Sequence, residues 1–364
     1  MRQTARASGG RSEPVGGRTV NQQESPKRRQ VSPEVQQQIH QDSEHFRKCL
    51  DYLREHAAGE QEGFYGPDSM TWVIYREPVI LLGGLRAILL QIAHPAVAIG
   101  VAQNSNFRGD LLGRARRTYT AMYQLVFGGL REAMGAAKRV HSLHSRVNGS
   151  LPAGAAGSQG EGRYRANDPL LQRWVLATLI DGALVVYETF VRPLSVEEKR
   201  RFYQESRLAA AQFGLLPEQM PPTLEAFYDW YHEQLAGDAL RVEDTARELA
   251  GLLFNSPFTR GQLDELLTAG LLPQRWREAY GLAWGPGQQR AWRLLKGTMR
   301  RAINLTPPTL RCVTAWHQAQ LRLAQARGKR PTVMARVLNT LDSYVDVPFS
   351  IRPVATKAPA ADKH

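Results

Sequence analysis

At 364 residues the chain is long enough for one large domain or two ordinary ones, and a hydrophobic content of 43% allows a sizeable buried core. Its two cysteines, Cys49 and Cys312, lie far apart and outside any CxxC or CxxCH motif. This spacing argues against structural zinc and covalently attached haem, and favours a reducing compartment. The first thirty residues lack the apolar core of a secretory signal, so we expect a cytoplasmic protein.

The net charge of +13 raises the question of a nucleic-acid partner, since Lys and Arg number 47 against 34 Asp and Glu. The basic residues are spread along helical segments, often beside glutamate, and only Lys27–Arg29 forms a compact run. No recognition motif with interleaved aromatic residues occurs. We therefore expect a generally basic enzyme surface without a specific nucleic-acid partner, and at most a weak peripheral membrane contact through the basic tail.

Residues 1–33 are predicted to be a disordered basic tail, and a polar helix is predicted over 34–57. The very apolar segment 79–102 follows and has the length of a membrane span, roughly 20 residues. It nevertheless contains Arg86, and Pro95 after His94 breaks the helix in its second half. Charged groups at the bilayer centre are costly. We therefore expect two buried helices with a break between them, and no integral membrane segment.

The rest of the chain has helical periodicity and no sustained alternation, so we predict an all-α fold without a sheet. One large helical domain is expected over 34–340, followed by a C-terminal tail over 341–364. Pro169 after Asp168 marks a helix start, and Ser195 with Glu198 forms a capping box. The predicted helices are 110–134, 137–147, 169–191 and 196–213, then further helices beginning near Thr223, Val242, Gly261 and Gly287 and after Pro307–Pro308, with a Gly-rich loop over 150–163.

Three histidines, His94, His141 and His144, flank the most apolar part of the chain. A histidine in a dry pocket must be hydrogen-bonded or coordinate a metal. His141 and His144 are three residues apart on a helix, so both cannot bind one haem iron from one side. A histidine on an apolar helix face is more often a satisfied core residue. A di-iron bundle would require ExxH pairs, and the chain contains none.

Arg114, Arg117 and Thr118 are spaced to share one helical face. Such a cluster can hold the propionates of a haem by charge-assisted hydrogen bonds, with the threonine positioning an oxygen. It can equally be a solvated basic face. The spacing alone leaves both interpretations open.

Taken in order, several motifs resemble the oxygenase catalytic-domain family of latex clearing protein (a rubber oxygenase) and the endoplasmic-reticulum mycophenolic acid oxygenase. The resemblance covers residues 70–235 well and continues more loosely to 330. The matching stretches are Leu81–Ala87, Leu90–Gln91, His94–Pro95, Asn104–Phe107, Arg114 with Arg117–Thr118, Val126–Gly128, Val140 with His144, Val147 and Gly149, Tyr164–Pro169, Trp174–Val175, Tyr187–Glu188 and Pro193–Ser195.

This resemblance implies a helical fold enclosing a b-type haem pocket, with His144 as the ligand to the iron and dioxygen as co-substrate. Arg114 and Thr118 match positions that line the pocket, and they are the expected catalytic residues. Cofactor contacts are expected from His144, Arg114, Arg117 and His94. His141 is then left a supporting or surface role. The substrate would enter beside the 150–163 loop.

Departures from the family pattern separate two functional hypotheses. Latex clearing protein has a lysine where this chain has Arg117, and a guanidinium offers iron no lone pair. No Asp or Glu occurs over 78–109, and Leu176 and Asn104 stand where family members often have histidine. The first hypothesis is a haem b-dependent oxygenase acting on a small apolar molecule, unsaturated or prenyl-type, with an unassigned electron donor. The second is a non-catalytic helical protein that binds haem or lipid.

Overall fold

The computed structural model describes residues 33–104, 111–152, 162–255, 261–330 and 332–344. The chain divides into two units between Asp42 and Ser43, and every contact discussed below lies within the second. The predicted basic run Lys27–Arg29 and most of both predicted tails lie outside the described residues.

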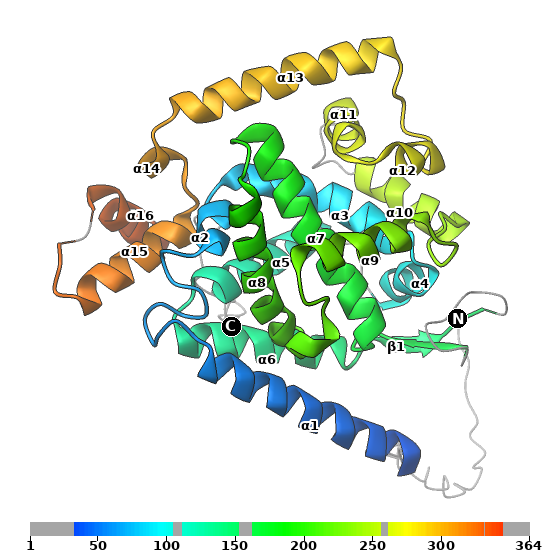
Figure 1. Ribbon diagram of the computed structural model, residues 1–364, viewed down its shortest axis with the longest axis horizontal. Coiled ribbons are helices and arrows are strands. Elements are labelled where there is room, and N and C mark those ends of the chain that lie inside the picture. The colour runs from blue at the N-terminus through cyan, green and yellow to red at the C-terminus, as the bar shows by residue number, and fades with distance from the viewer. Residues whose placement is uncertain (1–32, 105–110, 153–161, 256–260, 331, 345–364) are drawn as a thin grey trace, which may run out of the picture. The chain divides into compact units, whose positions relative to one another are not determined.

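The described part of the chain is built almost wholly of helices, which confirms the predicted all-α class (Figure 1). The elements are α1 (Pro33–Glu55), α2 (Met70–Tyr75), the 3-10 helix η1 (Pro78–Leu82), α3 (Gly83–Ile92), α4 (Pro95–Asn104), α5 (Leu111–Phe127), α6 (Leu130–His144), β1 (Asn148–Ser150), β2 (Arg163–Arg165), α7 (Pro169–Phe190), α8 (Val196–Gln212), η2 (Pro217–Gln219), α9 (Leu224–Ala236), α10 (Asp244–Phe254), α11 (Gln262–Leu271), α12 (Gln274–Ala279), α13 (Pro286–Leu305), α14 (Pro308–Arg311), α15 (Thr314–Ala326) and α16 (Val333–Tyr344).

Helix α7 is the central element of the main hydrophobic core and packs along α3 (Figure 1). Its start was predicted: the Asp168 carboxylate accepts a hydrogen bond from the Leu170 amide at 2.9 Å, and Pro169 occupies the first helical turn. α7 is itself long and apolar enough to cross a membrane. The expectation that 79–102 is the one segment that could be proposed as a span was wrong, because α7 is a second. Since 72% of the apolar window of α7 is buried inside the protein, it has the character of a core helix.

The segment 79–102 forms two helical stretches with a break at the predicted place. The stretch from Pro78 to Ile92 and helix α4, which begins at Pro95, meet at an angle of 110°. Most side chains of α3 and of the first half of α4 are buried in the core. Both the buried packing and the break before Pro95 are therefore confirmed.

Arg86 of α3 lies fully inside the core and is paired with Asp181 of α7. Its Nη2 donates to the Asp181 carboxylate, and its Nε donates to the Leu271 carbonyl of α11 at 2.9 Å. Burial by itself lowers the pKa of Arg86, but Asp181 and the nearby Tyr231 outweigh this effect and raise it. Arg86 therefore connects α3, α7 and α11 through one buried charged group.

Helices α5 and α6 form a helical hairpin, and this corrects the predicted helix boundaries. The sequence predicts one helix that continues to residue 134, whereas α5 ends at Phe127 and α6 begins at Leu130. The intervening Gly128 and Gly129 explain the difference, because glycine is a poor helix former and a frequent helix terminator. The chain therefore reverses at the two glycines, and α6 packs back along α5.

A short antiparallel hairpin follows α6, where the sequence analysis expected no sheet. Strands β1 and β2 pair Asn148 with Arg165, Gly149 with Tyr164 and Ser150 with Arg163. Three residues a strand are too few to produce the alternation by which strands are recognised in a sequence. The hairpin encloses most of the predicted 150–163 loop, of which residues 153–161 lie outside the described part of the chain.

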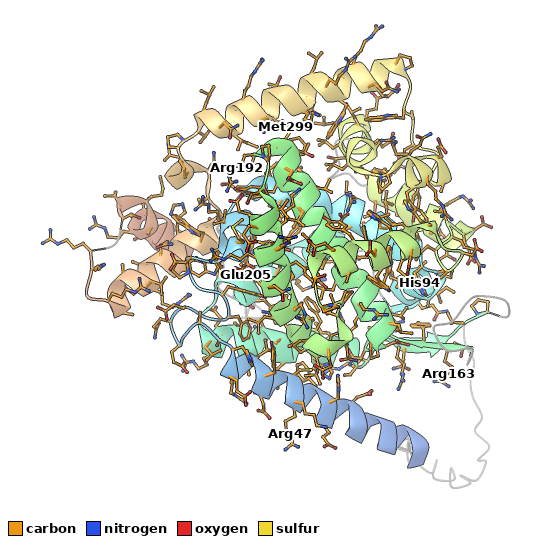
Figure 2. The ribbon with its side chains drawn as sticks, in the orientation of Figure 1. Arg47, His94, Arg163, Arg192, Glu205 and Met299 are labelled. Carbon is orange, nitrogen blue, oxygen red and sulfur yellow. The ribbon has the colours of Figure 1, made fainter. Side chains whose placement is uncertain are left out.

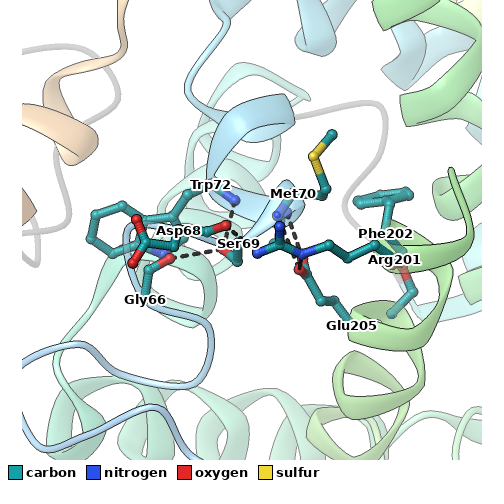
Figure 3. A network of polar contacts seen from close by, with 10 residues as sticks. Gly66, Asp68, Ser69, Met70, Trp72, Arg201, Phe202 and Glu205 are labelled. Atoms are coloured by element: carbon teal, nitrogen blue, oxygen red, sulfur yellow. Dashed lines mark hydrogen bonds and ion pairs between the residues drawn. The ribbon is translucent and has the colours of Figure 1, made fainter. Parts of the chain in front are cut away.

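The short helix α2 is held at its N-terminus by a network of polar contacts with α8 (Figure 3). The Glu205 carboxylate accepts hydrogen bonds from the amides of Met70 and Thr71 at 3.0 and 2.7 Å, and from the Thr71 hydroxyl at 2.7 Å. The Ser69 hydroxyl accepts from the Trp72 amide at 3.1 Å. A carboxylate and a hydroxyl thus satisfy the first backbone donors of α2, which fixes the connection that leads into η1 and α3.

Helix α13 is anchored to the core by Trp292. The indole of Trp292 is buried edge-on against Phe190 of α7, with ring centroids 5.8 Å apart. It also lies over Gly270 of α11, where a Cβ would come within 2.4 Å of the ring. Only glycine leaves room for this contact.

We expect Gly270→Ala to lower the free energy of unfolding by about 1–3 kcal/mol, because the rigid indole of Trp292 must move away from the new methyl group. Urea or thermal unfolding measures the effect. Gly251→Ala on α10 is the matched control, because a Cβ there meets nothing within 4 Å. The control should be neutral or stabilising by up to about 1 kcal/mol. Equal stability of the two variants would show that Trp292 does not dock on Gly270.

Candidate functional site

His144 is the last residue of α6 and is half-buried. Its Nδ1 is fully shielded from solvent and has no hydrogen-bond partner in the part of the chain that the structure describes. A buried imidazole nitrogen without a partner is costly, so such atoms mark positions where a ligand or metal can supply the missing interaction. The imidazole of His144 therefore stands out as a candidate binding group.

The electrostatic surroundings of His144 keep its imidazole neutral. Burial, together with the nearby His141 and Arg114, lowers the pKa of His144 to about 4. At neutral pH the ring thus has a free lone pair on one nitrogen. A neutral imidazole is the form that binds a metal.

The α5–α6 hairpin brings Arg114 near His144, as the electrostatic effect of Arg114 on this histidine shows. Arg114 lies in the first turn of α5 and is half-buried, and burial together with Arg117 lowers its pKa. Arg117 and Thr118 are exposed on the same helix. The electrostatic effect of Arg114 on His144 places a cationic side chain close to a neutral imidazole.

His141 has different surroundings from His144. Its ring stacks on that of Phe46 in α1, with centroids 3.7 Å apart and an interplanar angle of 2°. Gly214, which follows α8, lies next to its Nδ1, close enough that a Cβ there would be 3.6 Å from this atom. These contacts pack the ring of His141 between α1 and the segment that follows α8.

His94 serves as a helix cap (Figure 2 shows its place at the start of α4). Its Nδ1 accepts a hydrogen bond from the Ala96 amide at 3.2 Å, and its carbonyl accepts from Val97 and Ala98. Burial lowers the pKa of His94, against the opposing effect of Asp168. Because Nδ1 accepts, the proton of the neutral ring lies on Nε2. Binding a metal through Nε2 would require moving this proton to Nδ1 and would break the cap.

The family of the chain follows from its similarity to known proteins. Residues 71–301 match the family described as ER-bound oxygenase mpaB/B'/Rubber oxygenase, catalytic domain. The chain belongs to this oxygenase family. Uncharacterized protein Mb2261 of Mycobacterium bovis and Uncharacterized protein Rv2237 of Mycobacterium tuberculosis are each 25% identical to it over 231 residues, which is 60% of this chain and 87% of the relative. No solved structure matches the chain.

The match to the oxygenase family includes all the residues singled out above. It begins within α2 and ends within α13, so the α5–α6 hairpin and the β1–β2 hairpin lie inside it, and α14 to α16 lie beyond it. The resemblance inferred from the sequence motifs is thus confirmed. The roles of His144, Arg114, Arg117, Thr118 and His94 remain predictions.

Tyr164 of β2 is a polar residue near this region to which the sequence analysis assigned no role. Its hydroxyl donates to the Gln103 Oε1 at 2.8 Å and accepts from the Asn104 Nδ2 at 2.6 Å. A Cβ on Gly149 would lie 2.7 Å from this hydroxyl, and one on Gly100 would lie 3.2 Å from the ring. Gly149 and Tyr164 both occur in the motifs that carry the family resemblance. Only this feature of the sequence could have indicated Tyr164.

The β1–β2 hairpin packs on α4 through a small apolar cluster. Its buried members are Ala96, Ile99, Leu151, Tyr164 and Leu171, and Val97 and Val147 flank them. Val147 belongs to the turn that leaves α6, and its amide donates to the His144 carbonyl at 2.9 Å. A buried apolar cluster thus begins one turn beyond His144.

A cleft of about 480 Å³ lies elsewhere, between η1, the end of α13 and the start of α15. Its lining includes Glu77, whose carboxylate is buried and paired with Arg311 at 2.9 Å. This ion pair neutralises the buried carboxylate of Glu77, and none of the predicted site residues lines the cleft. The chemistry expected from the sequence is therefore not associated with this cleft.

Proposed function

We propose that the protein is a haem b-dependent oxygenase that acts on a small apolar molecule, with unsaturated and prenyl-type compounds as the candidate substrates. The observation that carries the proposal is the neutral imidazole of His144, which has a buried nitrogen without a partner and lies beside Arg114. Membership of the oxygenase family supports an oxygen-using enzyme. We propose haem as the cofactor because of the chemistry of the side chains at the site.

These residues fit a non-covalently bound haem. One neutral histidine is sufficient as protein ligand to its iron, and a nearby arginine is a suitable partner for a propionate. The described residues contain no cluster of three or more His, Cys, Asp or Glu side chains that could hold a bare metal ion. We assign His144 as the ligand to iron, Arg114 and Arg117 as cationic partners of the propionates, and His94 as a neighbouring contact.

Haem, when bound, supplies the iron at which dioxygen, the co-substrate, is activated. The protein contributes the surroundings of this reaction. The Thr118 hydroxyl, one helical turn after Arg114, can donate a hydrogen bond to the oxygen co-substrate. Arg117 can act only as a cation, because its guanidinium stays protonated and has no lone pair. An apolar substrate is the expectation that the family resemblance carries.

The next inferences concern the cellular compartment and the partners of the proposed enzyme. Cys49 and Cys312 are both free and buried, which suits the reducing cytoplasm. We infer no specific nucleic-acid partner and no integral membrane segment, since α7 and the α3–α4 pair are core helices by their burial. The electron donor is unassigned.

An absorption spectrum of the purified protein tests the proposal, and a Soret band is expected. His144→Ala should lose the band, whereas His141→Ala should largely keep it, because His141 is held by packing against Phe46. Circular dichroism of both variants checks that they are folded. Equal loss of haem in the two folded variants would show that His144 is not the specific ligand, and a wild-type protein without a Soret band would overturn haem dependence.

A second function remains a candidate, namely a helical protein that binds haem or lipid without turnover. The absence of any Asp or Glu over residues 78–109 favours it, because that segment then offers no carboxylate base. Oxygen consumption separates the two functions. The oxygenase should consume oxygen when an alkene or a prenyl compound is added to the haem-loaded protein and a reductant, whereas a carrier should show no increase over the rate without substrate.

A further inference from the structure

The surplus of positive charge is concentrated in one segment. Between Glu278 and Asp342 the chain has eleven Lys and Arg residues and no Asp or Glu. Of the 47 basic residues, the remaining 36 nearly balance the 34 acidic residues. The basic residues are spread along helical segments as expected, but those of this segment have no glutamate beside them. Eleven of the thirteen net positive charges therefore lie between Glu278 and Asp342, the segment that holds α13 to α15 and most of α16.

Helix α13 carries the largest share of this charge. It contains five cations and no acidic residue, and none of the five makes an ion pair with any residue that the structure describes. On other helices, exposed arginines are commonly paired, as Arg200 is with Glu225 and Arg247 with Asp244. The unpaired cations of α13 are Arg290, Arg293, Lys296, Arg300 and Arg301.

The inner and outer faces of α13 differ sharply. Trp292 is buried, and Leu295, Met299 and Ile303 pack against the core from the same face (Figure 2 labels Met299). Positions 290, 294, 301 and 305 follow the helical repeat on the opposite side. The outer face thus alternates arginine and leucine along a helix that lies at the periphery of the ribbon (Figure 1).

The leucines of this face are unusually exposed. Leu294 is 73% exposed and Leu305 is 84% exposed, and Leu310 of the adjoining α14 is 60% exposed. Isolated exposed leucines are ordinary, but three of them among unpaired cations form a surface of mixed character. We call Arg290, Arg301, Leu294 and Leu305, together with the exposed Arg293 at their flank and with Leu310 of α14, the α13 face.

We propose that the α13 face binds the surface of anionic lipid bilayers. The arginines would contact lipid phosphates, and the leucines would enter the boundary between headgroups and acyl chains. A basic face with exposed leucines suits this interface, where both kinds of side chain are satisfied. A nucleic acid would match the cations and leave the leucines in water. The contact is peripheral and independent of the haem-dependent function.

Co-sedimentation of the full-length protein with vesicles tests this proposal. We expect binding to vesicles of phosphatidylserine and phosphatidylcholine, little binding to phosphatidylcholine alone, and loss of binding at high salt. The triple variant Arg290→Gln, Arg293→Gln, Arg301→Gln should bind roughly a hundredfold more weakly, at roughly fivefold per cation. The double variant Leu294→Ser, Leu305→Ser should bind at least about tenfold more weakly.

Matched controls distinguish binding through the α13 face from the effects of net charge and of exposed apolar side chains elsewhere. Lys48→Gln, Arg54→Gln, Arg200→Gln removes the same charge from cations that are already paired with acids, and it should bind nearly as wild type. Leu143→Ser, Val196→Ser removes two similarly exposed apolar side chains elsewhere and should also bind as wild type. Circular dichroism confirms the fold of each variant.

Three outcomes would overturn the proposal. The first is equal weakening by the α13 and control triple variants, which would indicate bulk charge. The second is loss of binding only when Lys27, Arg28 and Arg29 are changed to Gln, which would assign the contact to the tail. The third is binding to duplex DNA that depends on the α13 arginines, with no binding to anionic vesicles. If all of these variants keep the Soret band, membrane binding and the haem site are separate.

Discussion

Asp181→Ala is expected to lower the free energy of unfolding by about 3–5 kcal/mol, because it leaves the guanidinium of Arg86 buried without its counter-ion. Arg86 and Asp181 are both almost fully buried, so water cannot replace the lost partner. The remaining hydrogen bond from Arg86 to the Leu271 carbonyl does not neutralise the charge. Against a total stability of about 5–15 kcal/mol, this loss would bring the protein close to unfolding at moderate temperature.

Urea or thermal unfolding of the purified variant measures this effect, with Asp229→Ala as the control. Asp229 lies exposed on α9, and its removal should change stability by no more than about 0.5 kcal/mol. The double variant Arg86→Met, Asp181→Leu should recover most of the loss, because apolar side chains of similar volume carry no desolvation penalty. A double variant no more stable than Asp181→Ala would mean that packing and not charge dominates at this position.

The second large effect concerns pH. In the haem-free protein, His144 has a folded-state pKa of about 4, below the ordinary value of 6.5. Above pH 6.5 both folded and unfolded states have a neutral imidazole, and His144 has no effect. Between pH 6.5 and 4 the unfolded state binds a proton that the folded state does not, so stability falls as the pH falls. The loss attributable to His144 should reach about 3 kcal/mol near pH 4.

Unfolding in urea at several pH values between 7 and 4 measures this contribution, in the haem-free protein. His144→Gln should remove most of the slope in this window, because glutamine has no proton to gain. His56→Gln, at an exposed position just after α1, should keep the wild-type profile. If His144→Gln retains the full slope, another group causes the acid sensitivity and the imidazole of His144 is not shielded as described.

Features set by neighbouring residues could be predicted from the sequence. The Asp168 cap with Pro169, and the capping box of Ser195 and Glu198, depend on partners within three residues. The break before Pro95 likewise follows from the chemistry of one residue. Local rules thus predicted the starts of α4, α7 and α8, as well as the all-α class.

Features that depend on distant partners could not be predicted in this way. Asp181 lies 95 residues from Arg86, and nothing in either local sequence pairs them. Asn104 and Tyr164 are 60 residues apart, and their hydrogen bond exists because the β1–β2 hairpin packs on α4. The neutrality of His144 also results from burial by the fold. The sequence motifs could indicate the residues of the site, but the fold creates their electrostatic environment.

The position of the candidate site at helix ends has a consequence for ligand binding. His144 is the last residue of α6, and Arg114 lies in the first turn of α5. Terminal turns have fewer backbone hydrogen bonds than helix interiors and open more readily, so amide protons there exchange faster than those at the centre of a helix. A ligand that ties the two ends together must first restrict these fluctuations. Part of the interaction energy of the ligand is therefore offset by the entropy lost when the protein becomes ordered. Ligand binding should slow the exchange of amide protons at the ends of α5 and α6, even where no atom changes its average position.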